Sequence, residues 1–181
     1  ETWRDGWRHL RFMLLYSPTH LFLLPGLILL VPGLLLLLAE LPGPLYLGGR
    51  GFYIHFMILG SMLTILGYQV LTLGLYAKSY AFSIGVLRQD RTLTAIAPHY
   101  TLERGLKLGG LLFLIGFAVD LWILFHWIST SFGALDAIRP ALFASTLMVV
   151  GAQTMFSSFF LSLLAIRAGE RIGDVPRVGG D

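Results

Sequence analysis

Four long apolar runs dominate this chain and leave little choice of fold. They cover residues 18–39, 52–77, 102–127 and 140–166. Each run meets the requirement of about 20 residues for an α-helix that crosses a hydrocarbon core about 30 Å thick. Because lipid offers no hydrogen-bond partner to an open backbone, each run is expected to be helical. The sequence therefore predicts an all-α membrane protein with four transmembrane helices arranged as two hairpins.

Composition excludes a soluble alternative. Hydrophobic residues make up 56% of the 181 residues and charged residues only 13%, about half of the roughly 25% usual in soluble domains. A small soluble domain leaves too much of its surface wet to hide that apolar area. The chain has no cysteine, which excludes a disulfide framework and a thiolate metal site. The lipid bilayer is the expected partner, and no nucleic-acid partner is expected.

Basic residues are distributed unevenly between the two sides of the predicted membrane. The segment before the first run, the central loop and the C-terminal tail, with the helix ends beside them, hold Arg4, Arg8, Arg11, Lys78, Arg88, Arg91, Arg104, Lys107, Arg167, Arg171 and Arg177. The other two loops hold only Arg50 and Arg139. Cytoplasmic loops of membrane proteins are enriched in Lys and Arg. We therefore predict a multi-pass protein of the inner (plasma) membrane with both termini in the cytoplasm.

The same pattern divides the chain into five segments. Residues 1–17 are predicted to form an amphipathic juxtamembrane helix, and residues 18–77 the first transmembrane hairpin. A basic cytoplasmic loop with a short interfacial helix follows over 78–101. The second hairpin covers 102–166, and 167–181 form a cytoplasmic tail. Each hairpin is thus preceded by an amphipathic interfacial helix. Because the first residue is Glu1 and not Met, we expect the chain to be a piece of a longer polypeptide.

The N-terminal segment carries two stripes at helical spacing. Trp3 and Trp7 belong to an apolar stripe, and Arg4, Arg8 and Arg11 form a basic stripe beside it. A helix of this kind lies in the headgroup plane. It serves either as an orientation anchor alone or also as a site where guanidinium groups hold a lipid phosphate.

A second basic cluster is predicted around the central loop. Thr101 occupies an N-cap position before the third run, with Glu103 in its first turn. Glu103 and Lys107 can pair at i, i+4, which leaves Arg104 to face the headgroups. Arg104 is the strongest single candidate for a phosphate ligand, although a plain interfacial anchor is an equal alternative. The predicted lipid-phosphate ligands are Arg8, Arg11, Lys78 and Arg104.

Polar and small residues inside the runs are expected to mediate helix packing. Gln69 and Gln153 are predicted to be buried amides that hydrogen-bond between helices. Glycines that recur on one face, at Gly60, Gly67 and Gly74 and again at Gly105 and Gly109, permit close helix approach. Asp120 lies in the outer third of its run, where it is expected to reach water or to pair with His126 or Arg139.

A weak internal repeat relates the two predicted hairpins. At an offset of 84 residues, Gly67 falls on Gly151, Gln69 on Gln153 and Gly26 on Gly110. The offset matches the first run with the third and the second with the fourth, as in a parallel repeat. Chance matching among Leu and Gly is an equal alternative.

No catalytic or metal-binding motif is present. The sequence has no Asp-x-Asp pair, no Walker lysine loop and no G-x-S-x-G elbow, and its five His residues are not at metal-ligand spacing. We therefore predict no catalytic residue, no metal ligand and no cofactor in this chain.

Four stretches resemble one known family. Residues 5–26 (DGWRHLRFMLLYSPTHLFLLPG), 52–69 (FYIHFMILGSMLTILGYQ), 101–105 (TLERG) and 151–166 (GAQTMFSSFFLSLLAI) resemble the region after the catalytic domain in bacterial family 2 polyprenyl-phosphate glycosyltransferases, of the dolichol-phosphate mannose or glucose synthase type. The resemblance implies an upstream GT-A domain that moves a sugar from a nucleotide-sugar to a polyprenyl phosphate. The divalent metal and the catalytic residues would lie in that domain.

The resemblance implies that this chain is a fragment of a glycosyltransferase, and that it would anchor the enzyme in the cell envelope and present the polyprenyl phosphate. Two alternatives remain at this stage. One is a small stand-alone transporter or flippase of lipid-linked sugars, which favours polar groups at the membrane midplane. The other is an oligomerisation module that forms a homo-oligomer through its glycine faces.

Overall fold

The computed structural model describes residues 6–7, 19–47, 49–83, 102–130 and 137–173. In these ranges, four helices are long and apolar enough to cross a membrane: His20–Ala39, Ile54–Ser83, Leu102–Ser129 and Ile138–Leu164. The predicted all-α membrane fold is confirmed. Much of the apolar surface of these helices is exposed in the isolated chain, because lipid, not protein, covers it in the membrane.

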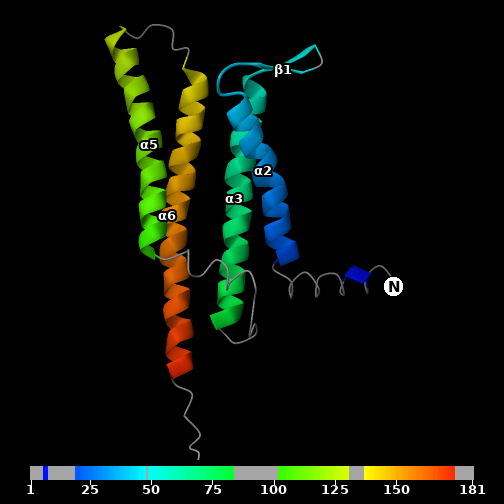
Figure 1. Ribbon diagram of the computed structural model, residues 1–181, viewed down its shortest axis with the longest axis vertical. Helices are drawn as coiled ribbons and strands as arrows, with labels where there is room; N and C mark the ends of the chain where they lie inside the picture. The colour runs from blue at the N-terminus through cyan, green and yellow to red at the C-terminus, as the bar shows by residue number, and fades with distance from the viewer. Residues whose placement is uncertain (1–5, 8–18, 48, 84–101, 131–136, 174–181) are drawn as a thin grey trace, which may run out of the picture.

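The elements follow one another in a simple up-and-down order (Figure 1). A π-helical turn, η1 (Thr19–Leu23), leads into α2 (Leu24–Ala39), and the strands β1 (Leu45–Leu47) and β2 (Arg50–Phe52) connect α2 to α3 (Ile54–Ser83). The second half consists of α5 (Leu102–Ser129) and α6 (Ile138–Gly173). Pro25 is the second residue of α2, directly after η1, and Pro32 lies inside the helix.

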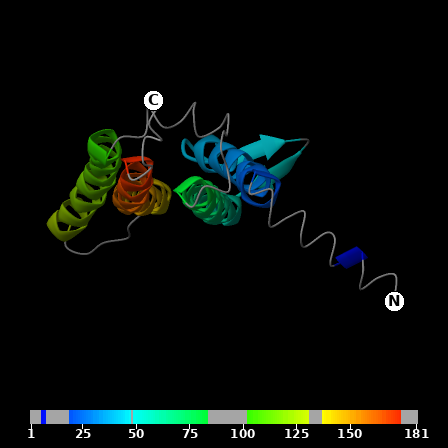
Figure 2. The ribbon, with the colours of Figure 1, turned by 90° about the horizontal axis from the view of Figure 1, so that it is seen from below.

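The four helices stand nearly in a row, with α3 and α6 in the middle (Figures 1 and 2). α2 packs against α3, α5 packs against α6, and α3 contacts α6. α2 and α5 begin at the lower end of the bundle in Figure 1, where α3 and α6 end. The described ends of η1 and α6 therefore lie on one side of the bundle, and the two helix pairs run in the same sense.

Glycines allow the close approach within each pair. A Cβ atom added at Gly60 would lie 2.7 Å from the Leu37 backbone nitrogen, and one added at Gly33 would lie 2.6 Å from the Thr64 nitrogen. In the other pair, a Cβ atom at Gly151 would lie 2.6 Å from the Gly109 oxygen. The predicted glycine faces thus serve contacts inside each pair, where they let backbones touch.

These contacts also refine the internal repeat. In the second helix of each pair, Gly67 and Gly151 correspond at the predicted offset, and both are buried against the first helix. In the first helix the partner of Gly151 is Gly109, not Gly110. The repeat in space is therefore shifted by one residue in the first helix relative to the predicted alignment.

Hydroxyl groups join α3 to α6. The hydroxyl oxygens of Ser61 and Thr146 lie 2.7 Å apart. The hydroxyl oxygens of Tyr68 and Thr154 lie 2.6 Å apart. The Tyr76 hydroxyl donates to Ser157 Oγ at 2.5 Å. We call these three pairs the hydroxyl seam. They stand at successive depths through the bundle and link its two halves.

The connection between α2 and α3 at the upper end is a short antiparallel hairpin. β1 and β2 pair antiparallel, with Leu45 opposite Phe52 and Leu47 opposite Arg50. Gly49 adopts a φ of +76°, a left-handed conformation that glycine tolerates. Glu40, just after α2, is fully buried beneath this hairpin.

Two helices run further than predicted. α3 continues to Ser83, and α6 continues to Gly173, where the sequence prediction ended them at 77 and 166. Lys78 therefore lies within a helix and not at the start of a loop. Of the N-terminal interfacial helix, only Gly6 and Trp7 are described; both are helical, and Trp7 is exposed. The interfacial helix in the central loop falls outside the described residues and stays a prediction.

Candidate functional site

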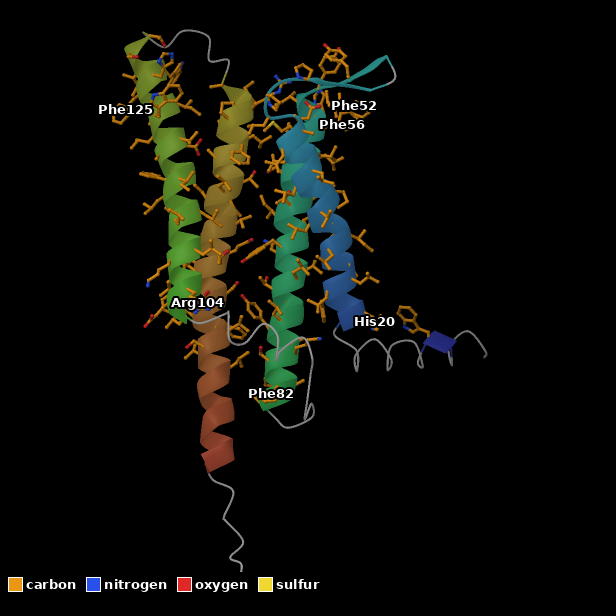
Figure 3. The ribbon with its side chains drawn as sticks, viewed as in Figure 1. His20, Phe52, Phe56, Phe82, Arg104 and Phe125 are labelled. Carbon is orange, nitrogen blue, oxygen red and sulfur yellow. The ribbon has the colours of Figure 1, made fainter. Side chains whose placement is uncertain are left out.

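The lower end of the bundle holds the predicted phosphate ligands that the structure describes. His20 at the start of η1, Phe82 near the end of α3 and Arg104 at the start of α5 all lie at this end (Figure 3). Successive helices run in opposite directions, so α2 and α5 begin at the end of the bundle where α3 ends. Residues far apart in the sequence therefore share one membrane level. Arg8 and Arg11 lie outside the described residues.

Arg104 is well placed to meet a lipid headgroup. It is exposed, in the first turn of α5. The next residue, Gly105, packs so closely on Ser158 of α6 that a Cβ atom there would overlap the serine hydroxyl. This contact fixes the start of α5 against α6 and leaves Arg104 on the outside of the bundle. A guanidinium group offers bidentate donors that match phosphate oxygens.

Lys78 is placed differently. Only 1% of its surface is exposed, whereas a ligand of a surface headgroup was expected. Gly74, one helical turn earlier on the same face of α3, contacts Phe22 and Leu23 of η1. Lys78 therefore continues the face of α3 that packs on the first helix. Lys78 and Arg104 therefore do not form one exposed cluster.

A groove opens between α3 and α6 at the level of the hydroxyl seam. Its volume is about 560 Å³, and its walls include Gln69, Leu73 and Tyr76 of α3 with Val149, Gln153 and Phe156 of α6. The prediction that Gln69 and Gln153 are buried and bonded between helices is wrong. Gln69 is exposed, and the buried Gln153 Oε1 has no partner. The neighbouring Tyr68 and Thr154 take the interhelical position, because their hydroxyls face each other.

The upper end contains an ion pair that the sequence did not indicate. Glu40 Oε2 lies 3.9 Å from Arg139 Nη2, and Glu40 Oε1 accepts a hydrogen bond from the Leu45 backbone N–H at 3.1 Å. Arg139 also lines a cavity of about 350 Å³ together with Leu41, Ile54 and Pro140. Arg139 was expected to be an available partner for Asp120. Asp120 instead accepts a hydrogen bond from Ser145 at 3.3 Å.

In the described ranges, no three His, Asp or Glu side chains lie close enough to hold a metal ion. The predicted ligands that the structure describes contribute one exposed guanidinium and one buried ammonium, and a groove opens between α3 and α6.

Comparison with known proteins shows what the chain is similar to. Residues 75–165 match the family described as glycosyltransferase family 2 C-terminal transmembrane region. The low-salt glycan biosynthesis hexosyltransferase Agl6 of Haloferax volcanii is 35% identical over 164 residues. That alignment covers 91% of this chain and 39% of the relative, so the chain spans about two fifths of that relative's length. No solved structure matches the chain.

Proposed function

The chain belongs to the C-terminal transmembrane region of family 2 glycosyltransferases, and from this premise we propose that it anchors such an enzyme and presents its polyprenyl-phosphate acceptor. Sugar transfer itself would be performed by a GT-A catalytic domain outside residues 1–181, which would also hold the divalent metal. In this proposal the chain alone binds the acceptor and transfers no sugar.

The orientation is part of the proposal. The Lys and Arg residues that flank the lower end outnumber those of the upper loops, Arg50 and Arg139. Under the positive-inside rule the lower end faces the cytoplasm, in the inner (plasma) membrane. Nucleotide-sugars are soluble, so a catalytic domain that uses them would meet the acceptor phosphate at this surface.

The observation that carries the proposal is the position of Arg104. It is exposed at the lower end, on a helix start that Gly105 and Ser158 hold in place. A polyprenyl phosphate places its chain in the membrane and its phosphate at this level. Lys78, which is buried, and Arg8 and Arg11, which lie outside the described residues, are the remaining proposed ligands.

Binding of a polyprenyl phosphate to the purified chain in lipid nanodiscs tests the proposal. We expect Arg104→Gln to lower the affinity about tenfold, since a charge-assisted hydrogen bond contributes roughly 1.5–3 kcal/mol and exposure weakens it. Lys107→Gln is the matched control, because Lys107 is also exposed and lies on the same helix.

The uncharged polyprenol serves as the second control. It should bind more weakly than the phosphate to the wild-type chain and equally to Arg104→Gln and wild type. Equal losses for Arg104→Gln and Lys107→Gln, or no preference for the phosphate, would refute the proposed site.

A further inference from the structure

The α3–α6 groove contains two amide side chains that lack partners in the described structure. The Gln69 side chain is exposed, and Gln153 is partly exposed although its Oε1 is enclosed by the protein and accepts no hydrogen bond. An occupant of the groove can therefore meet the whole Gln69 amide but only the N–H groups of Gln153. A carboxamide carries two N–H donors and an acceptor oxygen. Leaving such a group unpaired in an apolar medium is costly. The groove therefore requires an occupant that brings hydrogen-bonding groups.

The depth of the groove narrows the choice of occupant. Gln69 precedes Lys78 in α3, and at 1.5 Å per residue it lies about 14 Å nearer the upper end of the bundle. That distance is about half of a hydrocarbon core roughly 30 Å thick, so both amides stand near the bilayer centre. Lipid chains at this depth carry neither donors nor acceptors. Another transmembrane helix does, through the side chains that bond helices together in membranes.

We propose that the groove is the contact surface for a second copy of this chain. The Gln69 Oε1 of one protomer would accept a hydrogen bond from an amide N–H of the partner subunit's Gln153, because the Gln153 oxygen is enclosed within its own chain. The reciprocal bond would form at the same time. This inference is independent of acceptor binding at the lower end.

Symmetry supports this pairing. Two copies inserted in the same direction are related by a two-fold axis along the membrane normal, so residues that pair across the axis must lie at equal depth. The hydrogen bond between Tyr68 and Thr154, 2.6 Å long, fixes their neighbours Gln69 and Gln153 at one level. The Gln69 oxygen accepts and the partner's Gln153 N–H donates, and the two-fold axis repeats this bond, so the reciprocal pair is self-complementary.

The rest of the surface agrees with this choice. Phe156 is 72% exposed and Leu73 52% exposed at the rim of the groove, where they offer apolar contact. The glycines are not available for the expected oligomer contact. They pack against the other helix of their own pair, at Gly60, Gly67, Gly109 and Gly151. The groove is the lipid-facing surface of α3 and α6 that combines amides with large apolar side chains.

Disulfide crosslinking tests the contact directly, because the chain has no native cysteine. A mixture of Leu73→Cys and Phe156→Cys chains, each full length and in its membrane, is expected to form disulfide-linked dimers under mild oxidation, because the proposed contact sets α3 of one protomer against α6 of the other. Leu35→Cys on α2 and Leu114→Cys on α5 are matched controls, since both residues are 63% exposed and lie away from the groove. Crosslinking no greater in the groove variants than in the controls would overturn the proposal, as would a crosslink to a different protein.

Energy transfer between labelled copies in vesicles measures the contribution of the amides. Gln69→Leu and Gln153→Leu are each expected to raise the dimer dissociation constant about tenfold, because each substitution removes both symmetric hydrogen bonds. Ser145→Ala removes a polar group of α6 outside the groove and should leave the dimer dissociation constant unchanged. Unchanged association in both Gln variants would rule out the amide pairing.

Discussion

Glu40 Oε2 lies 3.9 Å from Arg139 Nη2, and this ion pair ties the end of α2 to the start of α6. Glu40 is fully buried, while 28% of the Arg139 side chain is exposed. The carboxylate has therefore lost its water and depends on the arginine for compensation. The pair joins the two halves of the bundle at the upper end, as the hydroxyl seam does through its depth.

Removing the arginine should destabilise the chain more than removing both charges. We expect Arg139→Met to cost about 2–4 kcal/mol, because an uncompensated buried carboxylate is left behind. The double variant Glu40→Gln/Arg139→Met should recover much of this loss, since the amide keeps the acceptor for the Leu45 N–H. Unfolding of the detergent-solubilised chain measures both, with Lys107→Met as an exposed control. Equal stability of the single and double variants would contradict this account.

Gly109 and Gly110 are adjacent on α5, but alanine substitutions at the two positions are expected to have very different effects on stability. A Cβ atom at Gly109 would lie 2.7 Å from the Gly151 oxygen, whereas one at Gly110 would meet only Met155 Sδ at 3.9 Å. Gly109→Ala is therefore expected to cost about 1–3 kcal/mol by overpacking. Gly110→Ala should change stability by at most a few tenths of that cost. The same unfolding measurement applies, and similar effects of the two substitutions would show that α5 and α6 do not approach at Gly109.

The proposed orientation predicts which positions an impermeant maleimide can reach. Tyr46 in β1 is 66% exposed at the upper end, and Glu103 is exposed in the first turn of α5 at the lower end. In intact cells, we expect Tyr46→Cys to be labelled from outside and Glu103→Cys to be labelled only after the membrane is opened. The cysteine-free chain provides the background for both. Labelling in the reverse order would invert the topology and remove the lower end from the cytoplasm.

The spans were predictable from sequence, but several of their contacts were not. Apolar length alone marks a membrane helix, because the bilayer sets the required number of residues. Spacing also predicted the packing of Gly60 and Gly67, since a glycine row on one helix face has few other uses. The partner of a polar side chain depends on helix rotation and depth, which spacing does not determine. The prediction that Gln69 and Gln153 are buried and hydrogen-bonded was therefore not met within the chain, and Arg139 was not connected to Glu40.

Burial limited the sequence prediction of the site in a similar way. Lys78 and Arg104 both flank the central loop, and a count of charges treats them alike. The structure separates them, because α3 extends past Lys78 and buries it, while Gly105 pins α5 and leaves Arg104 outside. Helix ends are poorly marked in this region, where apolar residues such as Phe82 continue the run into the basic segment.

The lowest pair of the hydroxyl seam provides the last prediction. The Tyr76 hydroxyl donates to Ser157 Oγ at 2.5 Å, and the Tyr76 ring packs edge-on against Phe160 with centroids 4.7 Å apart. Tyr76→Phe keeps the ring contact and removes only the hydrogen bond. A double-mutant cycle with Ser157→Ala should give a coupling of about 0.6–1.7 kcal/mol, the range found for hydrogen bonds between membrane helices. Tyr80→Phe, on an exposed side chain one turn later, is the control and should have little effect. Because this pair joins α3 to α6, a coupling near zero would mean that the Tyr76–Ser157 hydrogen bond does not help to hold the two helices together.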